Sequence, residues 1–201
     1  MSDHHKETFI TKYIFSQDHK MIAKQFLITG MIMAVLGMIM SAVFRVQLAN
    51  PGESSILYSL LPGSWVNEMG ALNPDKYLAL VTMHGTILVF WVLTAGLSGT
   101  FANFLIPLQI GARDMASGFL NMLSYWFFFA ATIVLVSSIY VQGGPASGGW
   151  TIYPPLSALP QAIPGSGTGM TLWLVSITLF VVGSLLGGLN YIVTILNLRT
   201  K

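Results

Sequence analysis

A histidine within a long apolar segment is the residue of this sequence that is best placed to bind a metal. His84 occurs in the string Thr82-Met83-His84-Gly85-Thr86, near one end of an uncharged stretch. Ionisable residues inside membrane spans are costly, so each one is a candidate functional group. A neutral imidazole can ligate a metal or a heme iron, and Gly85 leaves room for a flat ligand. The alternative is a histidine that hydrogen-bonds a neighbouring helix.

Arg45 closes the first apolar segment, and the charge pattern described below places it at a depth similar to that of His84. One interpretation is an arginine that snorkels to the lipid headgroups. The other is a guanidinium that donates to a carbonyl or carboxylate close to His84. The residues alone leave both interpretations open.

Asp114 lies in the short connection between the second and third apolar segments. A carboxylate at the mouth of a polar file can collect protons for a water chain, and three side chains can continue such a file inward: Asn103, Asn121 and Ser184. The alternatives are a surface carboxylate that caps the next helix or pairs with Arg113. Asn190, on the fourth segment, can likewise serve as a helix–helix hydrogen bond.

Four apolar segments must position these groups, and the composition predicts that they span a membrane. Of 201 residues, 54% are hydrophobic and 8% are charged, whereas soluble domains carry roughly 25% charged residues. A transmembrane helix needs about 20 mostly apolar residues. We therefore expect an all-α integral membrane fold in which four helices cover the segments 22–45, 77–108, 119–141 and 169–197.

The distribution of lysine and arginine predicts the orientation of these helices. Seven of the nine basic residues lie in the N-terminal segment, the second connection and the C-terminal tail, and only Arg45 and Lys76 lie on the opposite side. By the positive-inside rule, both termini face the cytoplasm. A net charge of +2 does not indicate a nucleic-acid partner,. The absence of cysteine excludes a disulfide scaffold, a zinc ribbon and an iron–sulfur site built by this chain,.

Seven short sequence motifs occur along the chain in a characteristic order. They are Phe15-Ser16-Gln17-Asp18-His19-Lys20, then Arg45 with Asn50-Pro51-Gly52, Tyr77 with Thr82, His84 and Gly85, Asn103-Phe104-Leu105-Ile106-Pro107-Leu108, Ile110-Gly111-Ala112-Arg113-Asp114-Met115-Ala116 with Asn121, Gly149-Trp150-Thr151-Ile152-Tyr153-Pro154-Pro155-Leu156, and Asn190-Tyr191-Ile192-Val193-Thr194-Ile195. Over nearly the whole chain, this order resembles the N-terminal part of subunit I of the heme–copper oxidases, of the cytochrome c oxidase type.

The resemblance implies a role for each matching residue. His84 corresponds to one of two axial ligands of a low-spin heme, expected to be heme a, and Arg45 to an arginine that hydrogen-bonds the heme periphery. The same pocket is expected to include Ser41, Tyr77, Val81, Gly85 and Leu88, with Gly149 and Trp150 near the propionates. Asp114 corresponds to the entrance carboxylate of a proton channel, which continues past Asn103, Asn121, Ser184 and Asn190.

The chain departs from the family pattern in three respects. Ser117-Gly118-Phe119 stands where the family usually has Phe-Pro-Arg, and Gly183-Ser184 stands where many relatives have two serines. Family members have twelve spans, so we expect this chain to be a fragment of a longer subunit or one chain of a split one. The second low-spin heme ligand, the ligands of copper and of the high-spin heme, and the tyrosine of the binuclear site are not in this chain.

The resemblance therefore implies one part of the catalytic subunit of a respiratory terminal oxidase. Such an oxidase reduces oxygen with electrons from cytochrome c and pumps protons across a bacterial-type plasma (inner) membrane. The expected partners are the remaining helices of subunit I, subunits II and III, an electron-donor complex and membrane lipids. Two alternatives remain: a quinol oxidase of the same family, and a non-catalytic four-helix assembly subunit in which His84 is merely packed.

Overall fold

The four apolar stretches form four long helices in the computed structural model, which describes residues 8–162 and 167–200. The first helix is α1 (His19–Ala49) and the last is α5 (Thr168–Leu198). The second crossing, Pro74–Ile110, consists of α2 (Pro74–Thr86), a π-helical segment η4 (Ile87–Leu97) and α3 (Ser98–Ile110). The third, Gly118–Tyr140, consists of α4 (Gly118–Ser137) and the short η5 (Ser138–Tyr140).

The predicted all-α membrane fold is confirmed for the residues that the structure describes, which contain no strand beyond an isolated bridge between Val66 and Leu72. Each long helix covers the segment predicted for it, except that the third ends one residue before position 141. Three short helical segments lie outside the four crossings: η1 (Ile10–Ile14), η2 (Ile56–Leu60) and η3 (Gly63–Trp65).

The helices begin and end at residues whose chemistry satisfies free backbone groups. Asp18 caps α1 by accepting a hydrogen bond from the Met21 amide at 2.9 Å, and Ser117 caps α4 at the Leu120 amide. Such side-chain caps satisfy amides that have no partner within the helix. The second crossing ends at Gly111, whose φ of 73° is left-handed and costs glycine little.

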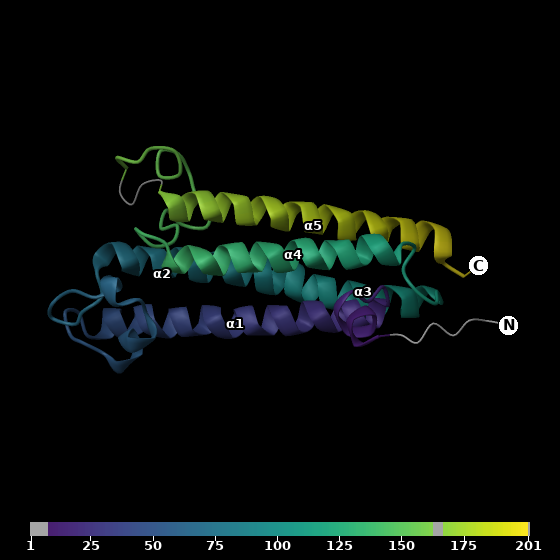
Figure 1. The fold of residues 1–201 in the computed structure, drawn as a ribbon, viewed down its shortest axis with the longest axis horizontal. Helices are drawn as coiled ribbons and strands as arrows, with labels where there is room; N and C mark the ends of the chain where they lie inside the picture. Colours follow the sequence, from purple (N-terminus) through teal and green to yellow (C-terminus); the bar gives the residue numbers. More distant parts are fainter. Residues whose placement is uncertain (1–7, 163–166, 201) are drawn as a thin grey trace.

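The four crossings run side by side, with α1 and α5 on opposite sides of the bundle (Figure 1). The segment η1 and the C-terminal end of α5 lie at one end, and residues 50–73 and 141–162 lie at the other. Two buried tryptophans cross-brace the helices: Trp91 donates to the Thr132 hydroxyl at 2.9 Å, and Trp173 donates to the Thr86 hydroxyl at 3.1 Å. These bonds hold the second crossing against both α4 and α5.

Two glycines allow α1 and η4 to approach closely. A Cβ added to Gly30 would lie 2.9 Å from the Cα of Gly96, and one added to Gly96 would lie 3.1 Å from the Cα of Gly30. Small residues at such crossings let the backbones of membrane helices touch. Because both neighbouring atoms are backbone, neither can turn aside to accommodate a side chain.

We therefore expect Gly30→Ala to lower the thermal unfolding midpoint of the complex that contains this chain. Overpacking of this kind costs about 1–3 kcal/mol. The matched control is Gly188→Ala, because no described atom lies within 4 Å of a Cβ added there. Thermal melts of the two purified variants test this, and equal unfolding midpoints would show that the α1–η4 contact can accommodate an added methyl group.

Candidate functional site

The His84 imidazole is held by a single hydrogen bond to α1. Its Nδ1 lies 2.8 Å from the carbonyl oxygen of Gly37, and its ring meets the Phe44 ring edge-on at 5.4 Å between centroids. A carbonyl can only accept, so Nδ1 carries the proton and Nε2 keeps its lone pair. A hydrogen bond of this kind orients histidines that ligate metals. The helix–helix bond considered above is therefore present, and it leaves the second ring nitrogen able to ligate.

The residues predicted around His84 lie on two neighbouring helices. Tyr77 packs edge-on against Phe44 at 6.1 Å between ring centroids. The side chain of Leu88 lies 3.2 Å from the position of a Cβ on Gly37. Val81 is 38% exposed and lies about one helical turn from Tyr77 and from His84 along α2.

Ser41 and Arg45 lie on α1, one helical turn apart. Arg45 is exposed and Ser41 is half-buried, and neither side chain makes a hydrogen bond or ion pair with any residue that the structure describes. The structure therefore gives no carboxylate or carbonyl partner for Arg45 within this part of the chain. Its guanidinium can therefore bind a group that lies outside the described part of the chain.

The loop after η5 packs on α2 at the residues on either side of His84 in sequence. The Gly149 amide donates to the Thr82 hydroxyl at 2.8 Å. Trp150 lies over Gly85, where its Cδ1 is 3.5 Å from the position of an added Cβ, and it meets Phe90 at 5.9 Å between ring centroids. Gly149 and Trp150, more than 60 positions away in sequence, thus contact Thr82 and Gly85, close to His84 in the sequence of α2.

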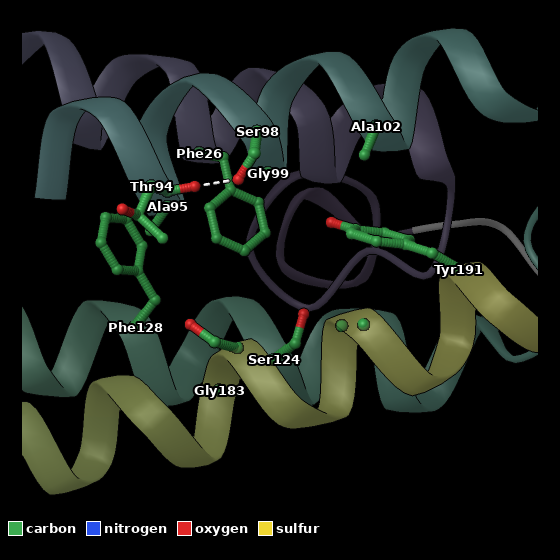
Figure 2. Close-up of a pocket in the computed structure, with 13 residues that line it drawn as sticks. Phe26, Thr94, Ala95, Ser98, Gly99, Ala102, Ser124, Phe128, Gly183 and Tyr191 are labelled. Carbon is green, nitrogen blue, oxygen red and sulfur yellow. Dashed lines mark hydrogen bonds between the residues drawn. The ribbon is translucent and has the colours of Figure 1, made fainter. Parts of the chain in front are cut away.

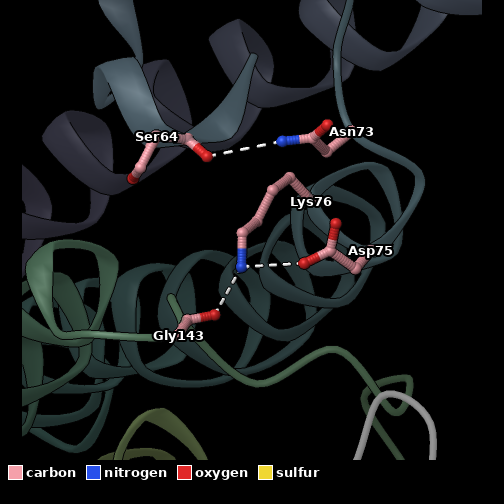
Figure 3. A network of polar contacts seen from close by, with 5 residues as sticks. All are labelled: Ser64, Asn73, Asp75, Lys76 and Gly143. Atoms are coloured by element: carbon pink, nitrogen blue, oxygen red, sulfur yellow. Dashed lines mark hydrogen bonds and ion pairs between the residues drawn. The ribbon is translucent and has the colours of Figure 1, made fainter. Parts of the chain in front are cut away.

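Lys76, near the start of α2, forms a hydrogen bond with the loop that follows η5. Lys76 donates to the Gly143 carbonyl at 2.5 Å and pairs with the Asp75 carboxylate at 2.9 Å (Figure 3). Its side chain is 13% exposed. Asn73 adds a bond to the Ser64 carbonyl at 3.4 Å, which joins η3 to the same corner. These contacts position the loop that carries Trp150.

The donor set around His84 fits one face of a heme and not a complete metal centre. No group of three or more histidine or acidic side chains is close enough to hold a metal ion in the described residues. His84 would supply one nitrogen and Val81 and Leu88 would supply apolar contacts, while Trp150 covers Gly85 at ordinary contact distance.

Asp114 contacts the start of α1. Its Oδ1 accepts hydrogen bonds from the Met115 amide at 2.7 Å and from the His19 amide at 3.3 Å. His19 is buried, and its Nδ1 lies 2.9 Å from the Asn103 carbonyl oxygen. His19 thus connects Asp114 with Asn103. His19 was not predicted as a site residue, because its contacts with Asp114 and Asn103 join positions 84 or more residues apart.

The two buried amides behind Asp114 have polar atoms without protein partners. The Asn103 amide nitrogen donates to the Gly99 carbonyl at 2.7 Å and to the Tyr191 hydroxyl at 3.0 Å, while its Oδ1 has no partner in the described chain. Asn121 is fully buried, and neither its Oδ1 nor its Nδ2 has a partner among the described residues. Buried amides are normally bonded to protein or to ordered water. Their surroundings therefore favour water.

Asn190 is engaged differently from the other predicted channel residues. Its Oδ1 accepts from the Ser117 amide at 2.9 Å, and its Nδ2 donates to the Ser117 carbonyl at 3.1 Å. One turn on, the Thr194 hydroxyl accepts from the Ala116 amide at 2.9 Å. This geometry favours the helix–helix interpretation of Asn190, because the amide is occupied in fixing the connection to α4.

A cavity of about 320 Å³ lies between α1, the second crossing, α4 and α5. Ser184 lines it, as do two hydroxyl residues that the sequence analysis did not select, Ser124 and Tyr191, which project into the space (Figure 2). The remaining lining is mainly apolar and includes Phe26 and Phe128. Serines and tyrosines in an apolar helix are usually interpreted as packing, so no local signal distinguishes these two.

The chain is similar to known proteins over nearly its whole length. A sequence model of the family described as cytochrome c and quinol oxidase polypeptide I matches residues 21–201. The alternative cytochrome c oxidase subunit 1 of Bradyrhizobium diazoefficiens is 41% identical over 198 residues, which cover 98% of this chain and 31% of that protein. Cytochrome c oxidase subunit 1 of Synechocystis is 35% identical, covering 100% of this chain and 32% of that protein.

A third relative joins two subunits in one chain. The heme-copper oxidase subunit I+III of Aeropyrum pernix is 35% identical over 191 residues, which cover 95% of this chain and 21% of that protein. The chain thus spans a third or less of the length of the curated relatives described here.

Proposed function

The chain belongs to the cytochrome c and quinol oxidase polypeptide I family, and from this membership we propose that it forms the N-terminal part of the catalytic subunit of a proton-pumping terminal oxidase. In this proposal it holds one face of a low-spin heme and the entrance of a proton channel. The observation that carries it is the bond from His84 Nδ1 to the Gly37 carbonyl, which leaves Nε2 as a ligand atom.

The part played by each residue follows from its contacts. The Gly37 carbonyl fixes the ring of His84, and the Phe44 ring packs edge-on against it. Arg45 is available to donate to the heme periphery, while Ser41, Tyr77, Val81 and Leu88 exclude water. When bound, a bis-histidine heme carries one electron at a time at a potential tuned by such polar contacts and burial.

The proton channel begins at Asp114 in this proposal. Its carboxylate is half-buried and contacts His19, which in turn contacts Asn103. The unpartnered amide atoms of Asn103 and Asn121 are suited to bind water, and ordered water is what carries protons through an apolar bundle,. Asn190 contributes by fixing the α4 connection.

The expected surroundings of the chain are those of a multi-pass membrane subunit. Exposed apolar side chains run along α5, where the remaining helices of subunit I or membrane lipids would cover them: Val181, Leu185, Leu189, Ile192 and Leu196. The relative named subunit I+III supports a contact with subunit III, and two relatives named cytochrome c oxidase support cytochrome c as electron donor. The lysine and arginine pattern supports cytoplasmic termini in a bacterial-type inner membrane.

Arg45→Met tests the proposed heme contact. We expect the absorption band of the low-spin heme to shift in the purified complex, because loss of a cation that donates to the heme periphery changes the electronic states of the heme, whereas binding of the heme is retained. Lys24→Met is the matched control, since Lys24 is another exposed basic residue of α1, 21 positions away from Arg45. A band that does not move in Arg45→Met would return Arg45 to the snorkelling interpretation.

A further inference from the structure

We propose that Pro107 is a positioning residue for proton uptake. Because it withholds a backbone amide from the Asn103 carbonyl, that carbonyl is left to hold His19, and His19 in turn orients the Asp114 carboxylate. Two hydrogen bonds connect these residues in that order. This inference rests on the proton-channel part of the proposed function and adds to it a residue that does not itself carry protons.

Pro107 lies inside α3, where it removes one hydrogen bond of the helix. In an α-helix the amide of each residue donates to the carbonyl four positions earlier, so residue 107 would serve the carbonyl of Asn103. Proline has no amide N–H, and its ring crowds that carbonyl. Asn103 lies seven residues before the end of α3 at Ile110, so its carbonyl is not one of the four that a helix leaves free at its C-terminus. Pro107 therefore takes away its regular helical donor.

The histidine at the start of α1 supplies the donor that Pro107 withholds. His19 Nδ1 lies 2.9 Å from the Asn103 carbonyl oxygen, and because a carbonyl can only accept, Nδ1 carries the proton of this bond. Both residues are buried, with 2% and 0% of their surface exposed. A buried carbonyl without a donor is costly. The bond thus holds the first residue of α1 against α3.

The backbone of His19 orients Asp114. Because His19 is the first residue of α1, its amide has no acceptor within the helix. It donates to Asp114 Oδ1 at 3.3 Å, and the Met115 amide donates to the same oxygen at 2.7 Å. Asp114 Oδ2 makes no hydrogen bond or ion pair with any residue that the structure describes. The carboxylate is therefore held by one oxygen, while the other is free to take up a proton.

Pro107→Ala tests this positioning, because it returns an amide that competes with His19 for the Asn103 carbonyl. In the oxidase complex reconstituted in phospholipid vesicles, we expect proton uptake to slow about tenfold, the effect of losing one hydrogen bond of typical strength. Leu108→Ala is the matched control, since it shortens an exposed neighbouring side chain of α3 and leaves every backbone amide in place. Its proton uptake should stay within about twofold of wild type.

A double-mutant cycle distinguishes positioning from a general effect on α3. His19→Leu keeps much of the side-chain volume but removes the donor, and it should itself slow proton uptake about tenfold. When it is combined with Pro107→Ala, we expect no further slowing, because the added amide then displaces no hydrogen bond. Equal slowing by Pro107→Ala in the presence and absence of His19→Leu would show that the proline acts through the shape of α3, and would overturn the inference.

Hydrogen–deuterium exchange follows the same contact without a measurement of proton uptake. In the purified Pro107→Ala complex, the His19 amide should exchange faster than in wild type, since release of the imidazole loosens the bond from this amide to Asp114. Leu108→Ala should leave this exchange rate unchanged. An unchanged rate in Pro107→Ala would overturn the inference, even if the His19→Leu complex fails to assemble.

Comparison with Asp114→Asn distinguishes failure of this inference from failure of the channel. If Asp114→Asn slows proton uptake but Pro107→Ala matches wild type, positioning by Pro107 is overturned and the channel stands. If Asp114→Asn leaves proton uptake unchanged, the proton-channel assignment itself is wrong, whatever the effect of Pro107→Ala.

Discussion

His84→Ala is expected to abolish the low-spin heme absorption of the oxidase complex that contains this chain. Alanine supplies no lone pair, so the iron would keep only the ligand that comes from outside the described residues, and a low-spin bis-histidine centre needs both. Reduced-minus-oxidised optical spectra and low-spin electron paramagnetic resonance of the purified complex measure the loss. Because His84 also bonds the Gly37 carbonyl on α1, the amount of assembled complex should be measured in parallel.

A second variant separates ligation from packing. In His84→Gly, imidazole added to the solution can occupy the vacated space, and we expect it to restore part of the low-spin signal. His19→Gln serves as the control, because it removes another buried histidine whose contacts are with Asn103 and Asp114 at the opposite end of the bundle. A low-spin spectrum that survives in His84→Ala would instead support the non-catalytic assembly subunit, in which His84 is merely packed.

The sequence is sufficient to predict the four crossings because their signal is local and strong. Each is a long apolar stretch, and each helix covers its predicted segment apart from the last residue of the third, extending up to four residues beyond it. The wide π-helical turn of η4 was not predicted. It lies where Gly30 and Gly96 bring two backbones together, and such a contact depends on a partner helix more than 60 residues away. A single uncharged stretch cannot reveal it.

The candidate site likewise contains residues that the sequence identifies and residues that it does not. His84, Arg45 and Asp114 are conspicuous because charged or ionisable groups are rare in this chain. Tyr191 and Ser124, which line the cavity between the helices, were not predicted because hydroxyls on apolar helices are common. The two interpretations of Asn190 could not be separated from its residue type; its two bonds to the Ser117 backbone favour the helix–helix one, and a place in the channel stays a prediction.

Asp114→Asn is expected to slow proton uptake about a hundredfold, as typical for the loss of a positioned proton-transfer group, without changing the heme spectrum. The structure indicates that this substitution can keep the hydrogen bonds between the side chain and the backbone. The carboxylate contacts the backbone only through Oδ1, which accepts from the His19 and Met115 amides. The Asn carbonyl can accept both bonds, so the start of α1 keeps its partner while the exchangeable proton is lost.

Asp18→Asn provides the matched comparison for this change. Asp18 is an exposed carboxylate at the same end of α1, where it caps the helix by accepting from the Met21 amide at 2.9 Å. Asparagine caps helices about as well as aspartate, so proton uptake in this variant should stay within about twofold of wild type. Equal slowing in both variants would mean that the negative charge of this surface, and not the Asp114 carboxyl, sets the rate. Wild-type uptake in Asp114→Asn would show that protons enter elsewhere, because no other predicted channel residue carries a carboxylate.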